Sequence, residues 1–184
     1  TTLVNYLVAK IDAKSYLEIG VCTGEHFNNI TCPDRVGVDP IDDRYDKKGG
    51  TFLLCTSDQF FVENKQLFDI IFIDGLHTAD QVVKDIRNAM AVLKPGGYIV
   101  CHDMNPQRGE HQIPEYNGGH WNGDCWKAFV SLRAEMHDWN FETVDIDWDK
   151  EPPLEDLIKN AALVGLETTM LGNNDLKPVK DLAK

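Results

Sequence analysis

Short, almost continuous apolar runs constrain the fold of this chain most strongly. Two of them, FDIIFID at residues 68–74 and GYIVCHD at residues 97–103, end on acidic or imidazole side chains. Runs of this length without polar alternation are typical of parallel strands that are buried on both faces of a sheet. The complete set of strands that the pattern predicts is 15–19, 35–39, 51–55, 68–73, 98–102 and 141–147.

Amphipathic stretches of helical length lie between these runs. The clearest spans residues 78–93, where apolar residues recur at helical spacing: Val82, Ile86, Ala89 and Leu93. Lys-Pro-Gly-Gly at 94–97 ends that helix, and a second helix is predicted from about residue 124 to residue 136. The alternation predicts a doubly wound, mostly parallel α/β sheet with helices on both faces, in a single domain that spans residues 1–184.

Two segments do not follow this alternation. Residues 104–123 are rich in Gly, Pro and Asn, and loops of this length are usually lids or binding loops, so we predict a lid or substrate loop. Its polar and aromatic candidates for substrate contact are His111, His120 and Trp121. Residues 149–184 form a C-terminal extension, in which 154–162 is a candidate helix and 163–170 a candidate further strand.

The composition excludes several classes of partner. A net charge of -12 repels polyanions, so we expect no nucleic acid and no anionic membrane as partner. No apolar run approaches the roughly 20 residues that span a bilayer. The five cysteines are widely spaced and contain no CxxC pair, which argues against a zinc or redox site and favours a reducing, cytoplasmic compartment. The sequence leaves the oligomeric state open, and a homo-oligomer is compatible with it.

A glycine turn follows the first predicted strand, in LEIGVCTG at residues 17–24. Ligands of doubly wound sheets bind beyond the carboxyl ends of the strands, where this turn lies. Gly20 and Gly24 would let the backbone approach a nucleotide-like ligand closely. The spacing differs from the G-x-G-x-x-G of dinucleotide folds, and an ordinary tight turn is the alternative interpretation.

Two acidic residues accompany this turn. Asp39 ends the next strand, in the position where a carboxylate can accept hydrogen bonds from both hydroxyls of a ribose. The alternative is a turn aspartate before Pro40. Glu18 is a carboxylate within an apolar strand, where it would suit a cationic ligand group, or it could reach solvent at the sheet edge.

A second group of polar residues ends two other strands. Asp74 and His77 follow one of these strands, and His102 and Asp103 end the other. If the strands are neighbours, the four side chains meet beside the glycine turn. They could bind a divalent metal, or a histidine could act as a general base. The alternative is that they cap loops and helix N-termini.

Taken together, LEIGVCTG, VGVDP (36–40) and LKPGGYIVCHD (93–103) resemble the S-adenosylmethionine (SAM) site of class I methyltransferases. The endings IDG-x-H and HD are most similar to small bacterial members of the Methyltransf_24 type. This resemblance implies a Rossmann-like class I methyltransferase fold. It also implies a set of cofactor-binding residues: Glu18, Gly20, Gly24, Asp39, Ser57, Asp58 and Asp74.

Within that set, the resemblance places Glu18 and the glycines at the methionine and ribose part of SAM and the loop at 56–58 by the adenine. It implies a methyltransferase that acts on a small-molecule acceptor at oxygen. The expected catalytic residues are His77, His102 and Asp103, and the expected ligands of Mg or Mn are Asp74, His102 and Asp103. His102 stands where related metal-dependent enzymes carry an acid, so metal use stays open.

Two other functions are compatible with the same residues. An NAD-binding oxidoreductase would use a similar fold, although the third glycine of the dinucleotide fingerprint is missing. A non-catalytic SAM-binding module would retain the glycine turn and Asp39 but would have no need of four polar side chains at the neighbouring strand ends.

Overall fold

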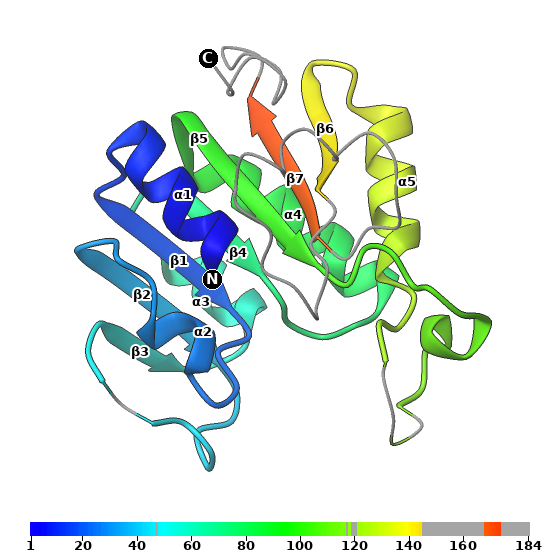
Figure 1. Cartoon of the computed structure of the whole chain (residues 1–184), viewed down its shortest axis with the longest axis horizontal. Coiled ribbons are helices and arrows are strands. Elements are labelled where there is room, and N and C mark those ends of the chain that lie inside the picture. Colours follow the sequence, from blue (N-terminus) through cyan, green and yellow to red (C-terminus); the bar gives the residue numbers. More distant parts are fainter. Residues whose placement is uncertain (47, 117, 119–120, 145–167, 174–184) are drawn as a thin grey trace.

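The computed structural model describes residues 1–46, 48–116, 118, 121–144 and 168–173, the last of these as backbone only. In this part of the chain, seven strands form one sheet in the order β3-β2-β1-β4-β5-β7-β6 (Figure 1). Their bounds are β1 Ser15–Ile19, β2 Asp34–Asp39, β3 Thr51–Leu54, β4 Phe68–Ile73, β5 Leu93–His102, β6 Trp139–Val144 and β7 Thr168–Asn173. Strands β1 to β5 pair in parallel, whereas β7 is antiparallel to both β5 and β6.

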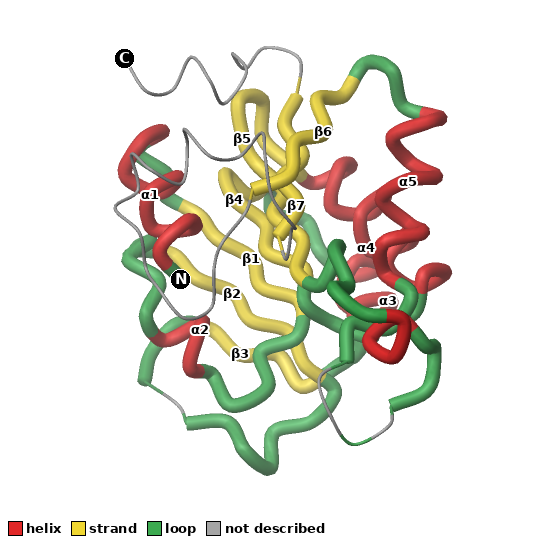
Figure 2. The backbone as a smooth tube through the Cα atoms, turned by 45° about the vertical axis from the view of Figure 1, so that its right-hand side comes forward, coloured by secondary structure: helices red, strands yellow, loops and turns green. Residues whose placement is uncertain are grey.

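The helices cover both faces of the sheet, as the continuous apolar strands require (Figure 2). Their bounds are α1 Thr2–Ile11, α2 Glu25–Asn28, α3 Ser57–Glu63, α4 Ala79–Val92 and α5 Cys125–Glu135, with a 3₁₀ turn at Gly109–Gln112. Successive residues of β1 pack into different cores. Tyr16 belongs to the core under α1 and α2, and Leu17 belongs to the core under α3, α4 and α5. The predicted doubly wound, mostly parallel α/β fold is confirmed.

The helix boundaries agree closely with the sequence pattern. The helix predicted at 78–93 is α4, and the one predicted at 124–136 is α5. The residues Lys-Pro-Gly-Gly at 94–97 do end α4, but they also form the beginning of β5, where the pairing with β4 shifts register. No helix in the described ranges is long and apolar enough to cross a membrane.

The end of the chain is partly described. The strand predicted at 141–147 is β6, which begins earlier, at Trp139, and is described to Val144. Strand β7 overlaps the candidate at 163–170 but is displaced toward the C-terminus. The candidate helix at 154–162 and the rest of the predicted extension at 149–184 lie outside the described residues, as does His120.

The parallel pairing determines where the functional candidates meet. Strands β1, β2, β4 and β5 run in the same direction, so their carboxyl ends lie at the same edge of the sheet. Gly20 follows β1, Asp39 ends β2, Asp74 follows β4 and His102 ends β5. Residues that are far apart in sequence are therefore brought together at this edge.

Candidate active site

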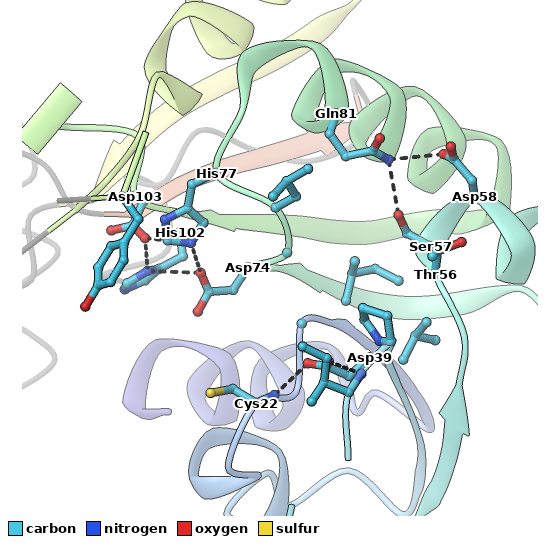
Figure 3. Close-up of a pocket in the computed structure, with 18 of the residues that line it drawn as sticks. Cys22, Asp39, Thr56, Ser57, Asp58, Asp74, His77, Gln81, His102 and Asp103 are labelled. Atoms are coloured by element: carbon cyan, nitrogen blue, oxygen red, sulfur yellow. Dashed lines mark hydrogen bonds and ion pairs between the residues drawn. The ribbon is translucent and has the colours of Figure 1, made fainter. Parts of the chain in front are cut away.

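A pocket of about 910 Å³ opens at the carboxyl ends of the strands. Eight of the predicted site residues line it: Gly20, Asp39, Ser57, Asp58, Asp74, His77, His102 and Asp103. Figure 3 labels all of them except Gly20. Two others, Glu18 and Gly24, are described but lie outside its wall. The wall also includes residues that the sequence analysis did not assign to the site, among them Cys22, Gln81 and Tyr116.

Asp39 lies at the pocket wall with both carboxylate oxygens engaged by backbone amides. Its side chain accepts hydrogen bonds from the Cys22 amide at 2.8 Å and from the Ile41 amide at 2.9 Å. Asp39 is 9% exposed, so these two bonds hold a nearly buried carboxylate in a fixed orientation. A carboxylate has about four acceptor positions, which leaves capacity for the hydroxyls of a ligand.

Gly20 is required by the close approach of two strand ends. It has a φ of +89°, and a Cβ atom there would lie 1.9 Å from the carbonyl oxygen of Asp74. No side chain fits in this space. Gly20 also lines the pocket. Its close approach to Asp74, the residue after β4, is by itself a sufficient reason for a glycine at this position.

Gly24 has a different and purely internal reason to be glycine. Its φ is +80°, and a Cβ would lie 2.6 Å from the ring of Tyr45, in the loop after β2. Among the described residues, the pocket wall does not include Gly24. The contact with Tyr45 is therefore sufficient to explain this glycine, and its assignment to the cofactor site stays a prediction.

Glu18 is also placed away from the pocket. It is 1% exposed, and its carboxylate accepts a hydrogen bond from the Tyr16 hydroxyl and lies 2.9 Å from Nδ1 of His26. The His26 ring in turn stacks on Phe72 at 4.2 Å. Glu18 therefore connects β1 to α2 on the face that α1 and α2 cover, and its expected contact with a cationic ligand group stays a prediction.

The Tyr16 partner could have been suspected from the sequence, since residues two apart in a strand share a face. Burial, and then the neighbouring Glu18 carboxylate, raise the pKa of the Tyr16 hydroxyl well above its ordinary value. Tyr16 therefore remains a hydrogen-bond donor to Glu18 at neutral pH. The part that His26 plays depends on how α2 folds back over the sheet, which no local pattern shows.

Ser57 and Asp58 lie at the start of α3, where Thr56 forms a capping box with Gln59. The Gln81 amide, from the first turn of α4, donates to Ser57 Oγ at 3.2 Å and to Asp58 Oδ1 at 3.1 Å (Figure 3). Gln81 thus joins α4 to the α3 end of the pocket. No sequence pattern identified Gln81 as a site residue, because its position within an amphipathic helix is typical of a solvated face.

The four polar residues at the ends of β4 and β5 form one cluster. Nε2 of His77 lies 3.3 Å from Asp74 Oδ1 and 3.2 Å from Asp103 Oδ2. Nδ1 of His102 lies 3.4 Å from the same oxygen of Asp74 and 3.2 Å from the same oxygen of Asp103. Each imidazole therefore faces both carboxylates, and the predicted meeting of these side chains is observed (Figure 3).

The carboxylates and imidazoles of this cluster stabilise one another in their charged forms. Burial lowers the pKa of His102, but Asp74 and Asp103 outweigh it and raise that pKa to about 11. Burial likewise opposes the charged form of His77, yet its contacts with Asp74 and Asp103 raise its pKa above the usual 6.5. Although burial favours the neutral acid, His102 and His77 hold the pKa of Asp74 far below its ordinary value. At neutral pH His102 keeps its proton, so His77 is the better general base of the two.

The expected metal ligands fit a divalent cation. Asp74, His102 and Asp103 each offer a donor atom, and these atoms all lie within 4.8 Å of one another. Two carboxylate oxygens with one imidazole nitrogen form a donor set that suits Mn²⁺ better than Mg²⁺, which prefers oxygen. Binding would require His102 to release its proton, because a protonated imidazole cannot coordinate a metal.

Residues 24–104 match the model of the Methyltransf_24 family, which is described as a methyltransferase domain. No curated protein matches the sequence. Among solved structures, Rv0187 from MTB, in its cofactor-bound form, has a TM-score of 0.62 at 14% identity and covers 95% of this chain and 80% of its own.

Two further solved structures are O-methyltransferases. The enzyme from Bacillus cereus in complex with SAH has a TM-score of 0.58 at 16% identity, covering 92% of this chain and 79% of its own. TomG from Streptomyces achromogenes, which is involved in tomaymycin synthesis and contains SAM, has a TM-score of 0.60 at 12% identity, covering 93% and 78%. At these identities the likeness shows the fold alone.

The fold is therefore that of the class I methyltransferases, and the resemblance seen in the sequence is confirmed. Over residues 24–104 the chain also matches the model of the Methyltransf_24 family, and this match agrees with the fold. The specific endings IDG-x-H and HD are not tested by these comparisons, and their assignment stays a prediction.

Proposed function

We propose that this protein is a SAM-dependent methyltransferase that transfers the methyl group of SAM to an oxygen atom of a small-molecule acceptor. The observation that carries the proposal is that a single pocket joins Asp39 to the cluster of Asp74, His77, His102 and Asp103. The end at Asp39, which we call the cofactor end, suits a nucleoside. The end at the cluster, which we call the acceptor end, suits proton transfer. The family match and the fold support methyl transfer as the reaction.

At the cofactor end, Asp39 would accept hydrogen bonds from the ribose hydroxyls. Ser57 and Asp58, at the start of α3, would lie beside the adenine. Gly20 lines the same wall and would leave room for the methionine part of SAM. The role proposed for Asp39 depends on its fixed orientation, which the Cys22 and Ile41 amides provide before any ligand binds.

At the acceptor end, the size and lining of the pocket favour a small molecule. The whole pocket, which would have to hold SAM and the acceptor together, has a volume of about 910 Å³, within the range of about 300–1,000 Å³ that is typical of small-molecule sites. Tyr116 and Trp121 line this end and offer apolar surface to an acceptor. The net charge of -12 disfavours nucleic acid as the acceptor.

The reaction is an in-line displacement in which the acceptor oxygen bonds to the methyl carbon while the bond from that carbon to sulfur breaks. S-adenosylhomocysteine (SAH) leaves, and the hydroxyl proton must be taken up by the protein. The pocket contributes mainly alignment and exclusion of water. His77, in its neutral form, is the group that would accept the proton, and Asp74 and Asp103 would stabilise the resulting imidazolium.

A divalent cation fits the proposal but is a separate part of it. Asp74, His102 and Asp103 would hold it, and when bound it would polarise the acceptor hydroxyl and favour loss of its proton. Calorimetric titration of the metal-free protein with Mn²⁺ and with Mg²⁺ tests this part. Stronger binding of Mn²⁺, lost in Asp103→Ala, supports it, and no binding of either ion removes it.

We also propose that the protein works in the cytoplasm. All five cysteines are free thiols in the structure, and three of them are buried. A disulfide-free set of thiols is typical of a reducing compartment.

Calorimetric titration with SAH, with NAD as the parallel ligand, tests the main proposal. SAH is the safer probe because it cannot react. We expect micromolar binding of SAH, about -8 kcal/mol, and no binding of NAD. Binding of NAD alone would replace the proposal with a hydride-transferring enzyme, and SAH binding without methyl loss from SAM across a broad acceptor panel would favour a non-catalytic module.

A further inference from the structure

Residues 121–124, with the sequence WNGD, close the long loop against the acceptor end of the pocket, and we call them the latch segment. All four consecutive residues contact the cluster or the beginning of α4 in the structure. Residues 121–123 were expected as the end of a lid or substrate loop, with Trp121 as a candidate for substrate contact, and Asp124 was expected as the start of the next helix.

Trp121 determines how the His77 ring is held. The two rings stack at 4.8 Å with an interplanar angle of 23°, which sets the plane of the imidazole. The Trp121 carbonyl oxygen lies 3.1 Å from His77 Nδ1. A carbonyl oxygen can only accept, so Nδ1 must carry a proton there, and Nε2 is left to face Asp74 and Asp103.

Asn122 determines how the Asp103 carboxylate is held. Asn122 is 8% exposed, and its side-chain amide donates to Asp103 Oδ1 at 2.7 Å. That bond uses one oxygen of Asp103 and leaves Oδ2 to face His77 and His102. Asp103 has a φ of +58°, an uncommon conformation for a residue other than glycine, so an added contact to its side chain helps to keep its orientation.

The other two residues fix the latch segment in place. Gly123 packs so closely that a Cβ there would lie 1.9 Å from the carbonyl oxygen of His77. Asp124 accepts a hydrogen bond at 2.7 Å from the backbone amide of Ala79, the first residue of α4. The backbone amide of Asn122 donates a hydrogen bond to the His111 carbonyl oxygen at 2.8 Å, and this bond connects the segment to the rest of the loop.

We infer that the latch segment positions the proton-transfer groups of the pocket, with Asn122 as the positioning residue for Asp103 and the Trp121 carbonyl as the group that directs Nε2 of His77 toward the carboxylates. Asn122 acts through Asp103 and does not itself line the pocket among the described residues. The inference rests on the proposed function for its catalytic consequence, but the orientation of the imidazole and carboxylate groups can be tested without turnover.

The test compares Asn122→Ala with Asn105→Ala as a matched control. Asn105 lies in the same loop, and its side-chain nitrogen has no hydrogen-bond partner among the described residues. Long-range ¹H–¹⁵N spectra of the imidazoles give the protonation pattern of His77 directly. We expect the wild type to show a protonated Nδ1, and we expect the His77 and His102 signals to move in Asn122→Ala and to stay in place in Asn105→Ala.

Kinetics provide a second readout. With an acceptor that the wild type methylates, we expect kcat of Asn122→Ala to fall about 10–100-fold, as for other residues that orient reactive groups, while the KM for SAM and the affinity for SAH stay unchanged. Asn122→Ser, which keeps a short donor, should recover part of kcat. If Asn122→Ala does not fold, Asn122→Leu, which has a similar size but no donor, is the test variant.

The outcomes separate the two proposals. Unchanged imidazole spectra in a folded Asn122 variant, with SAH binding intact, overturn the inference about the latch segment and leave the proposed function standing. Failure of the wild type to bind SAH overturns the proposed function, while the imidazole spectra still report whether Asn122 orients the cluster.

Discussion

The two ends of the pocket are built in different ways. At the cofactor end, Asp39 is held by two backbone amides of nearby loops, and its orientation depends on no other ionisable side chain. At the acceptor end, Asp74, His77, His102 and Asp103 hold one another through mutual charge. We therefore expect the first end to depend little on neighbouring side chains, whereas the second end should respond both to them and to pH.

Replacing His77 should have the largest effect on turnover. We expect His77→Ala to lower kcat about 10²–10⁴-fold, the usual contribution of a general base, because no other neutral base lies at its position. The affinity for SAH, measured by calorimetry, should remain that of the wild type. His111→Ala, in the 3₁₀ turn at Gly109–Gln112 and outside the pocket wall, is the control. Equal losses in both variants would mean that His77 has no special role.

Replacing Asp39 should weaken the binding of SAH, whereas replacing His77 should lower turnover. We expect Asp39→Ala to weaken SAH binding about 10–150-fold, since hydrogen bonds to a charged group contribute about 1.5–3 kcal/mol. Asp42→Ala is a matched control, because Asp42 is an exposed aspartate of the same loop that lies outside the pocket wall. Wild-type affinity in Asp39→Ala would remove the ribose assignment and with it the contrast between the two ends.

The pH dependence of kcat should reflect the acceptor end alone. His77 must lose its proton to act as a base, and its pKa is raised above 6.5 by Asp74 and Asp103 despite the opposing effect of burial. The rate should therefore rise about tenfold per pH unit below that raised pKa and level off above it. SAH binding should stay flat over the same range. A rate that is already level well below pH 6.5 would contradict the assignment of His77.

Replacing Glu18 should have the smallest effect on either end. Glu18→Ala removes the acceptor of the buried Tyr16 hydroxyl and leaves it the longer contact of 3.4 Å with Nδ1 of His26, so we expect the free energy of unfolding to fall by about 1–3 kcal/mol. Thermal unfolding measures this loss, with the exposed Glu25→Ala as control. SAH affinity of the folded variant should not change. A large loss of SAH affinity without loss of stability would show that Glu18 contributes to cofactor binding.

Several features of the fold were predictable because they depend on local pattern. The strand Phe68–Ile73 and the helix Ala79–Val92 follow from apolar periodicity that a few residues define. The meeting of Asp74 with His102 also followed, because parallel neighbours place their carboxyl ends together. The contacts of Gly24 with Tyr45 and of Glu18 with His26 were not predictable, because these partners come from elements whose packing the local sequence does not specify.

The sequence by itself determined the doubly wound sheet, the edge at which polar residues gather and the chemical types of those residues. These depend on the length and polarity of short runs, which are properties of neighbouring residues. Only the tertiary structure decided which residues face the pocket, that Gln81 joins its wall and that Asn122 holds Asp103. Such contacts join residues about twenty or more positions apart, and they depend on how helices and loops pack against the sheet, which no local pattern encodes.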